Sequence, residues 1–337
     1  MKKQILILAL LLPLLAGCTA KQPEPLPCTP GEAQRLVVYT SHKEEVYTPI
    51  IREFEERTGI WVDVVSGGTN ELLQRIQQEA DAPKADVMFG GGVESLESYQ
   101  DCFSPYICRE AAGISEQFQA ESGYWTPFSA LPVVLVYNTK LVAPESLTSW
   151  KDLVSPAFRG KIAFADPQIS GSSYTALVTW LQTGSGMEDS LTRLCTALDG
   201  KQLDSSGAVL TAVADGSALV GITLEETALQ HIAAGEDIAL VYPSDGTSCV
   251  PDGSALVKGA PHGDNARLFL DFTVSTDVQS MVGQRFCRRT VRADIPADPS
   301  LPPLSTLNMV SYDVEWASQN RDRLLSEWSF LLGEVPL

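Results

Sequence analysis

The sequence predicts an α/β fold with two lobes, each a mostly parallel sheet flanked by helices, joined by a hinge of crossing strands. β-rich runs alternate with segments whose apolar residues recur at helical spacing. Such alternation is typical of parallel sheets covered by helices on both faces. The chain has 337 residues, of which 44% are hydrophobic. This length suits two domains, and this composition suits cores of ordinary size.

Strands and helices alternate from the start of the first lobe. Three strands are predicted, at residues 36–39, 61–65 and 86–89. A helix at 44–57 separates the first two, and Gly59 marks its end. Further helices are expected after the turns at 66–69 and 90–92.

The apolar run at 131–137 is predicted to cross into the second lobe. That lobe has its own predicted strands, at 161–164, 218–222 and 238–242, and a predicted helix at 172–181. Apolar residues at helical spacing then predict helices at 264–274, 278–285 and 320–332.

The N-terminus has the layout of a secretory signal peptide, with a basic start, a short apolar stretch and small residues before Cys18. Residues 1–17 are the predicted signal, and Ala-Gly-Cys resembles a bacterial lipobox in which Cys18 is acylated. The alternative is a plain cleaved signal with an incidental cysteine. Residues 18–34 read as a polar, proline-rich tether. We therefore expect a lipid-anchored protein on the extracytoplasmic face of the cell membrane.

The net charge of −18 bears on the possible partners. It argues against nucleic-acid binding and against a polybasic membrane patch, since both need a basic face. A small anion remains possible, because backbone N–H groups can hold it locally.

Six cysteines remain besides Cys18, and an even number in an exported chain suggests disulfides. Cys102 and Cys108 are close in sequence and flank Pro105, so a local bridge between them is predicted. Partners for the other four stay open. No cysteine or histidine spacing predicts a metal site.

Small polar residues follow the predicted strands, where ligands bind in open α/β sheets. They form four loops, at 40–42, 66–69, 90–92 and 170–173. Several of these loops come directly before helices, whose free N–H groups and dipole favour an anion. Each loop alone could be an ordinary cap or turn, but four together predict a shared cleft.

Motifs for catalysis are missing from the sequence. It lacks the nucleophile elbow, the phosphate-binding loop and the zinc-protease helix. Glu225 and Glu226 have no evident nucleophile beside them. We expect the one dense basic cluster to form salt bridges, and the alternative is that it binds a ligand or a partner. This cluster comprises Arg285, Arg288, Arg289 and Arg292. We therefore predict that the protein is not an enzyme and has no cofactor. The rival hypothesis is that it is a phosphatase.

Several segments together resemble the bacterial type II extracytoplasmic solute-binding proteins, from about residue 35 to the end. They are 37–44, 54–60, 85–87, 137–139, 158–162, 166–167, 170–172, 242–246, 266–272 and 278–279. The most similar branch comprises the ferric-iron, hexose-phosphate and phosphonate binding proteins of ABC transporters.

The resemblance implies a type II periplasmic-binding-protein fold whose lobes are discontinuous in sequence. Lobe 1 is expected at 35–132 plus 260–337, and lobe 2 at 133–259. Iron-binding members carry two adjacent tyrosines where this chain has Thr223-Leu224-Glu225-Glu226. The loop at 90–92 also lacks their carboxylate, although the anion motif at 170–172 is retained.

We therefore expect a monomeric solute-binding component of an ABC importer that captures a hexose phosphate or a phosphonate. Alternatives are a ferric-iron-binding protein and a ligand-sensing partner of a membrane sensor kinase. The predicted ligand-binding residues are Ser41, His42, Gly68, Thr69, Gly91, Gly92, Ser170, Gly171, Ser172, Ser173, Ser205, Ser206, Thr223, Glu225 and Asp245.

Overall fold

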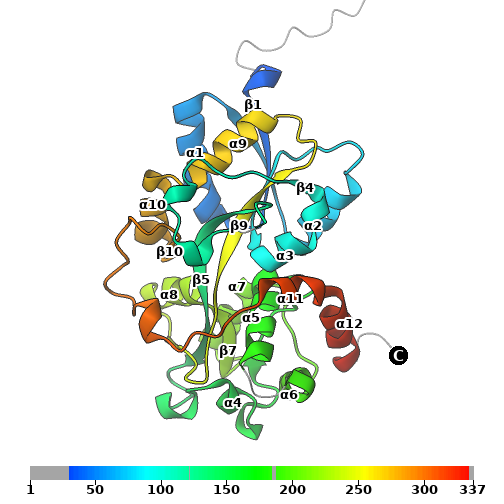
Figure 1. Cartoon of the computed structure of the whole chain (residues 1–337). Coiled ribbons are helices and arrows are strands. Elements are labelled where there is room, and N and C mark those ends of the chain that lie inside the picture. Colours follow the sequence, from blue (N-terminus) through cyan, green and yellow to red (C-terminus); the bar gives the residue numbers. More distant parts are fainter. Residues whose placement is uncertain (1–29, 121, 184–186, 334–337) are drawn as a thin grey trace, which may run out of the picture.

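The computed structural model describes residues 30–120, 122–183 and 187–333 (Figure 1). The predicted signal peptide, Cys18 and most of the tether lie outside these residues. Within them, no helix is both long enough and apolar enough for a membrane span.

The sheet of the first lobe is built around β1 (Arg35–Thr40). This strand lies parallel to β2 (Trp61–Ser66) on one side and to β3 (Val87–Gly92) on the other. β9 (Cys249–Val257) then pairs with β3 in the antiparallel sense, and the two-residue β4 (Phe103–Ser104) pairs with the end of β9.

Helices cover both faces of this sheet because successive strand residues point to opposite sides. Leu36 and Val38 face the core under α1 (Glu44–Thr58), α9 (Gly263–Thr273) and α10 (Thr276–Phe286). Tyr39 faces the other core, under α2 (Thr69–Gln78) and α3 (Val93–Ser98).

β5 (Thr126–Asn138) crosses between the lobes and is buried along its whole length. Its first half pairs with β9, and its second half pairs with β7 (Val220–Leu224) and β8 (Ile238–Val241). The predicted crossing strand at 131–137 is therefore confirmed. The strand β9, which returns the chain to the sheet of the first lobe, was not predicted.

The second lobe packs helices on both faces of β5, β7, β8 and β6 (Ile162–Ala163). Its helices are α4 (Trp150–Leu153), α5 (Gly171–Gln182), α6 (Met187–Leu198), α7 (Ser206–Ala214) and α8 (Glu225–Ala233). The larger core includes Trp150 and Trp180, and a smaller one lies under α7 and α8. Both sheets are mixed, since β5 and β9 run antiparallel to their neighbours.

The C-terminal segment does not stay in the first lobe, where residues 260–337 were expected. After α10, β10 (Arg289–Thr290) pairs with β5 in the first lobe. α12 (Arg321–Leu331) instead places Leu324 and Trp328 in the larger core of the second lobe, beside α6 in Figure 1. α11 (Val314–Gln319) connects the lobes, because Ser98 on α3 donates a hydrogen bond to the Ser318 carbonyl. The lobe boundary also shifts at β9, which ends inside the first sheet at Val257.

Short 3-10 helices complete the connections. They are η1 (Glu32–Gln34), η2 (Gln100–Cys102), η3 (Ala111–Gly113), η4 (Glu116–Phe118), η5 (Pro144–Ser146), η6 (Pro156–Phe158) and η7 (Leu304–Thr306).

The predicted bridge between Cys102 and Cys108 is absent from the structure, where both are free thiols. Cys102 packs against the core under α2 and α3, while Cys108 lies in a separate cluster with Ile114 and Phe118. The strand β4 between them directs the two side chains into different cores.

Candidate functional site

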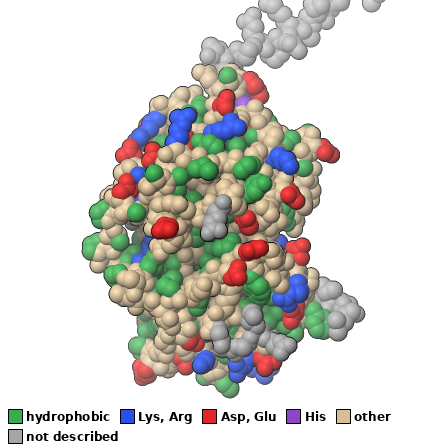
Figure 2. Space-filling view, in the orientation of Figure 1, with side chains coloured by type: hydrophobic (Ala, Val, Ile, Leu, Met, Phe, Trp, Pro, Cys, Tyr) green, Lys and Arg blue, Asp and Glu red, His purple; other side chains and the backbone are tan. Residues whose placement is uncertain are grey.

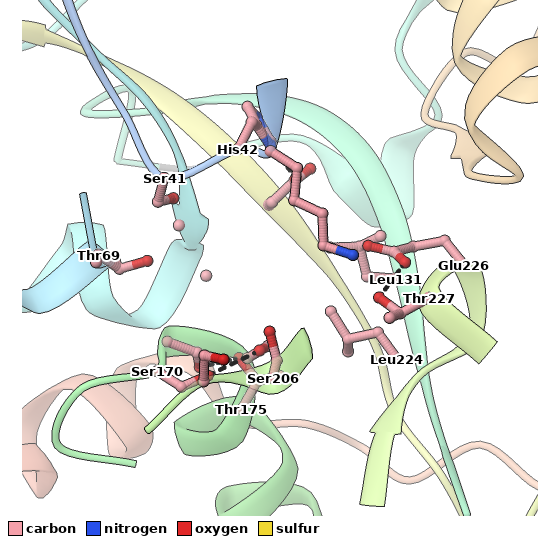
Figure 3. A pocket seen from close by; sticks show the side chains of 18 of the residues that line it. Ser41, His42, Thr69, Leu131, Ser170, Thr175, Ser206, Leu224, Glu226 and Thr227 are labelled. Carbon is pink, nitrogen blue, oxygen red and sulfur yellow. Dashed lines mark hydrogen bonds and ion pairs between the residues drawn. The ribbon is translucent and has the colours of Figure 1, made fainter. Parts of the chain in front are cut away.

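A cavity of about 360 Å³ lies between the lobes, at the ends of the strands (Figure 3). Its walls come from both lobes. They comprise Ser41, His42, Lys43, Gly67, Gly68, Thr69, Gly91, Gly92, Leu131, Ile169, Ser170, Gly171, Ser172, Thr175, Asp204, Ser205, Ser206, Leu224, Glu226, Thr227, Val250, Pro251, Asp252 and Arg288.

The N-termini of five helices converge on this cavity. Each helix has at least nine residues, and the residue that precedes it lines the cavity. These residues are Lys43 before α1, Gly68 before α2, Ser170 before α5, Ser205 before α7 and Leu224 before α8. Backbone N–H groups in a first helical turn lack intrahelical acceptors, and the helix dipole is positive there. The cavity is therefore suited to a negatively charged ligand.

The start of α5 is folded as a compact hydroxyl cluster. Ser170 caps the helix, since its Oγ accepts a hydrogen bond from the Ser173 N–H at 3.3 Å. The Ser172 Oγ lies 3.0 Å from the Ser170 Oγ. In the same cluster the Ser170 N–H donates to the Asp166 carbonyl at 2.8 Å. These bonds hold the first turn of α5 in place without any ligand.

α2 of the first lobe meets α5 of the second lobe at the edge of the cavity. A Cβ atom on Gly171 would lie 2.9 Å from the Thr69 Oγ1, which is closer than real contacts allow. Asn70 also donates to the Pro167 carbonyl at 3.3 Å. Glycine at position 171 therefore permits the two helix N-termini to approach one another.

His42 is a buried, neutral member of the site. Its ring stacks edge-on to Phe89 at 4.4 Å and lies 5.0 Å from Phe128. Burial, together with the positive charge of Arg288, lowers the pKa of His42 well below its ordinary value. Its Nε2 atom is buried and has no hydrogen-bond partner among the described residues. The imidazole is therefore an uncharged group enclosed in the wall of the cavity.

Arg288 holds two carboxylates at the far side of the cavity. It donates to Asp252 at 2.7 Å and to Glu226 at 3.0 Å. Burial raises the pKa of Asp252, against the opposing effect of Arg288. The Arg288 guanidinium group thus binds two buried carboxyl groups. The remaining lone pairs of their oxygen atoms can accept hydrogen bonds from a ligand.

Eleven of the fifteen predicted ligand-binding residues line the cavity. They are Ser41, His42, Gly68, Thr69, Gly91, Gly92, Ser170, Gly171, Ser172, Ser205 and Ser206.

The other four predicted residues have structural partners elsewhere. Ser173 turns back to Ser170, with its hydroxyl 3.2 Å from the Ser170 Oγ. Thr223 lies within β7, paired with Val134 of β5. Glu225 binds Arg289 and accepts a hydrogen bond from Tyr242. Asp245 accepts the Trp150 N–H at 3.0 Å and so caps α4. None of the four lines the cavity.

Other charged residues of the site were missed. Lys43, Asp204 and Asp252 line the cavity but were not among the predicted ligands. Asp252 follows Pro251 in a strand with poor β propensity, so no local pattern marked it. Arg288 belonged to a basic cluster for which salt bridges were expected, and it does form them, but it also faces the cavity.

Within the described residues, no group of three or more histidine, cysteine, aspartate or glutamate side chains is arranged to hold a metal ion.

The sequence matches a family model described as bacterial extracellular solute-binding protein, over residues 36–285. Among curated proteins, Iron uptake protein A1 of Synechocystis sp. is 26% identical over 306 residues, covering 86% of this chain and 84% of that protein.

Two solved structures show the same fold. The periplasmic binding protein AfuA from Actinobacillus pleuropneumoniae, with exogenous fructose-6-phosphate bound, has a TM-score of 0.83 at 24% identity. The match covers 89% of this chain and 99% of AfuA. A two-component system protein that mediates signal transduction has a TM-score of 0.77 at 24% identity, over 87% of this chain and 99% of its own. These matches confirm the predicted type II periplasmic-binding-protein fold.

Proposed function

This chain belongs to the bacterial extracellular solute-binding protein family, and from this premise we propose that it captures a small phosphorylated solute between its lobes. A hexose phosphate or a phosphonate is the expected ligand. The protein binds its solute without transforming it, as the family does. It serves as the solute-binding component of an ABC importer.

The observation that carries this proposal is the convergence of five helix N-termini on one cavity. A phosphate or phosphonate group accepts several hydrogen bonds and carries negative charge. The hydroxyls of Thr69, Ser170 and Ser172 and the nearby N–H groups supply matching donors. The organic part of the solute would then lie toward Glu226 and Asp252, whose oxygens can accept hydroxyl or amine protons.

Ferric iron is the main alternative, since one relative is an iron uptake protein. Iron(III) requires anionic oxygen ligands with free lone pairs. At the positions where iron-binding members carry tyrosines, Glu225 is bound to Arg289 and Glu226 to Arg288. Binding iron there would require both buried ion pairs to break, which favours the phosphorylated solute.

Thermal unfolding with a panel of solutes tests the proposal. The panel comprises fructose 6-phosphate, 2-aminoethylphosphonate, inorganic phosphate and ferric citrate. A solute at about 100 times its Kd stabilises the folded protein by ~2.7 kcal/mol, which raises Tm by about 4 °C for a chain of this size. We expect such a shift with a phosphorylated organic solute. A shift with ferric citrate alone would establish iron as the ligand instead.

A sensory role is the alternative to transport, because a signalling protein shares this fold. Uptake of the radiolabelled solute in a deletion strain separates the two roles. Loss of uptake supports the importer, whereas normal uptake combined with a lost transcriptional response supports a sensor kinase partner.

A further inference from the structure

Glu94 lies directly behind the wall of the cavity. It is the second residue of α3, and its side chain is fully buried. A Cβ atom on Gly92, which lines the cavity, would lie only 2.4 Å from the Glu94 Oε1. The carboxyl group is therefore folded back against the loop that forms this wall.

The Glu94 carboxyl group is bound to the opposite lobe. Thr175 of α5 donates its hydroxyl to the Glu94 Oε1 at 2.5 Å. The same hydroxyl lies 3.2 Å from the carbonyl oxygen of Gly171, in the turn that opens α5. The contact thus joins α3 of the first lobe to the helix whose N-terminus faces the proposed anion.

The second carboxyl oxygen of Glu94 is buried and has no hydrogen-bond partner among the described residues. An ionised carboxylate in this position would lack part of its hydration, at a high cost. A protonated carboxyl group would not carry that cost.

The charged and titratable groups around Glu94 do not neutralise it by a direct bond. Arg321 of α12 lies over the rings of Tyr99 and Tyr174, each at 5.7 Å, and pairs with Asp322 at 3.5 Å. The Tyr174 hydroxyl donates to the Ala317 carbonyl. The buried hydroxyl of Tyr312 has no partner among the described residues. Burial accordingly raises the pKa of Glu94 to about 7, against the lowering effects of Thr175, its own backbone N–H and Arg321.

We propose that Glu94 positions the N-terminus of α5 through Thr175, and that closure of the lobes around the solute takes up one proton at the Glu94 carboxyl group. This inference rests on the proposed function, in which the two lobes clamp a solute. Glu94 is a positioning residue, since it acts on the cavity through Thr175 and Gly92.

The sign of the pH effect follows from the two states. When the lobes separate, Glu94 reaches water and recovers its ordinary pKa of 4.5, whereas in the closed form its pKa is about 7. Protonation therefore favours the closed form. This stabilisation of the closed form is fully present below pH 4.5 and is lost as the pH rises through 7. The equilibrium constant for closure falls about tenfold per pH unit in this window, by a total on the order of 100-fold.

Calorimetric titration with fructose 6-phosphate between pH 5 and pH 8 tests the proposal. The proteins are the wild type, Glu94→Gln, and Glu315→Gln as a control that removes an exposed carboxylate from α11. The ratio of wild-type Kd to Glu94→Gln Kd should rise by ~100-fold across this range, since the amide does not titrate. The solute's own titration cancels in the ratio. Glu315→Gln should follow the wild type, and a flat ratio for Glu94→Gln would overturn the proposal.

Thr175 variants give a test that does not depend on the folding of Glu94→Gln. Thr175→Ser keeps the hydroxyl and should retain the wild-type pH profile. Thr175→Val removes the hydroxyl that stabilises the ionised Glu94 carboxylate. The affinity of this variant should therefore continue to fall at pH values where the wild-type affinity has levelled off. Identical profiles for the two variants would contradict the role of the Thr175 hydroxyl.

Small-angle scattering without solute separates failure of this inference from failure of the proposed ligand. If no variant binds fructose 6-phosphate, this sugar phosphate is not the ligand, and the radius of gyration then tests whether proton uptake is linked to closure. A larger radius at pH 8 than at pH 5 in the wild type but not in Glu94→Gln supports it. Equal behaviour of the two proteins overturns it.

Discussion

Ser172 is the second residue of α5 and lines the cavity beside Ser170. The segment 170–173 has no cationic side chain, so its attraction for an anion comes from N–H groups, hydroxyls and the helix dipole. Such a site is sensitive to any fixed negative charge placed within it. It is also neutral in itself, which allows it to exist in an acidic protein without a counter-ion.

Ser172→Asp should reduce the affinity for fructose 6-phosphate by at least ~100-fold in calorimetry, because like charges brought together cost several kcal/mol. Aspartate is favourable in the first turn of a helix, so the fold should not suffer. Ser326→Asp, on the exposed side of α12, is the matched control and should bind normally. Unchanged affinity of Ser172→Asp would show that the anion lies elsewhere.

At the scale of elements, two adjacent ion pairs join α8 of the second lobe to the segment around β10 in the first. Arg289 binds Glu225 through two hydrogen bonds of 2.7 Å, and Arg288 binds Glu226 at 3.0 Å. Both elements adjoin β5 near the point where it changes lobes. The pairs therefore bridge the lobes beside the hinge.

Arg289→Met should lower the free energy of unfolding by about 3–5 kcal/mol in urea titration, since it leaves the buried Glu225 carboxylate without its cation. The double variant Glu225→Gln with Arg289→Met should recover part of this loss. Arg159→Met, which breaks an exposed pair with Asp199, is the control and should cost at most ~1 kcal/mol. A similar cost for both single variants would contradict the importance of burial at the hinge.

Sequence patterns located most of these elements. The helix predicted at 44–57 is α1, and the turn predicted at 66–69 is confirmed at residues 67 and 68, between β2 and α2. The predicted turn at 90–92 is wrong, because these glycines are the last residues of β3, although α3 does follow them directly. Local signals sufficed there, because a helical period or a glycine-rich turn is written in neighbouring residues. The strand β9 was missed because Pro251, Asp252 and Gly253 are poor strand formers. It exists because β3 and β5 pair with it on both sides.

At the scale of the whole molecule, the protein is a two-lobed clamp with a net charge of −18. On the face shown in Figure 2, acidic side chains are spread over both lobes and do not gather in one patch. The helix N-termini at the cavity are the feature that favours an anionic solute in this acidic protein. We propose that acylated Cys18 tethers this clamp to the extracytoplasmic side of the membrane, close to its permease.

Cys18→Ser should move the protein from the membrane fraction to the soluble fraction and abolish its labelling by radioactive palmitate, because the thiol is the proposed acylation site. Cys28→Ser, ten residues downstream in the tether, should leave both unchanged. Membrane retention of Cys18→Ser with undiminished labelling would refute the lipid anchor.

The sequence by itself determined the α/β alternation, the first crossing strand and the small polar residues at the strand ends, since each depends on residues adjacent in the chain. The tertiary structure decided which of those residues share a cavity. It assigned Glu225 to Arg289, brought Arg288 and Asp252 to the cavity wall, and placed α12 in the second lobe. These outcomes depend on contacts between segments far apart in sequence, where burial and charge pairing outweigh local propensity.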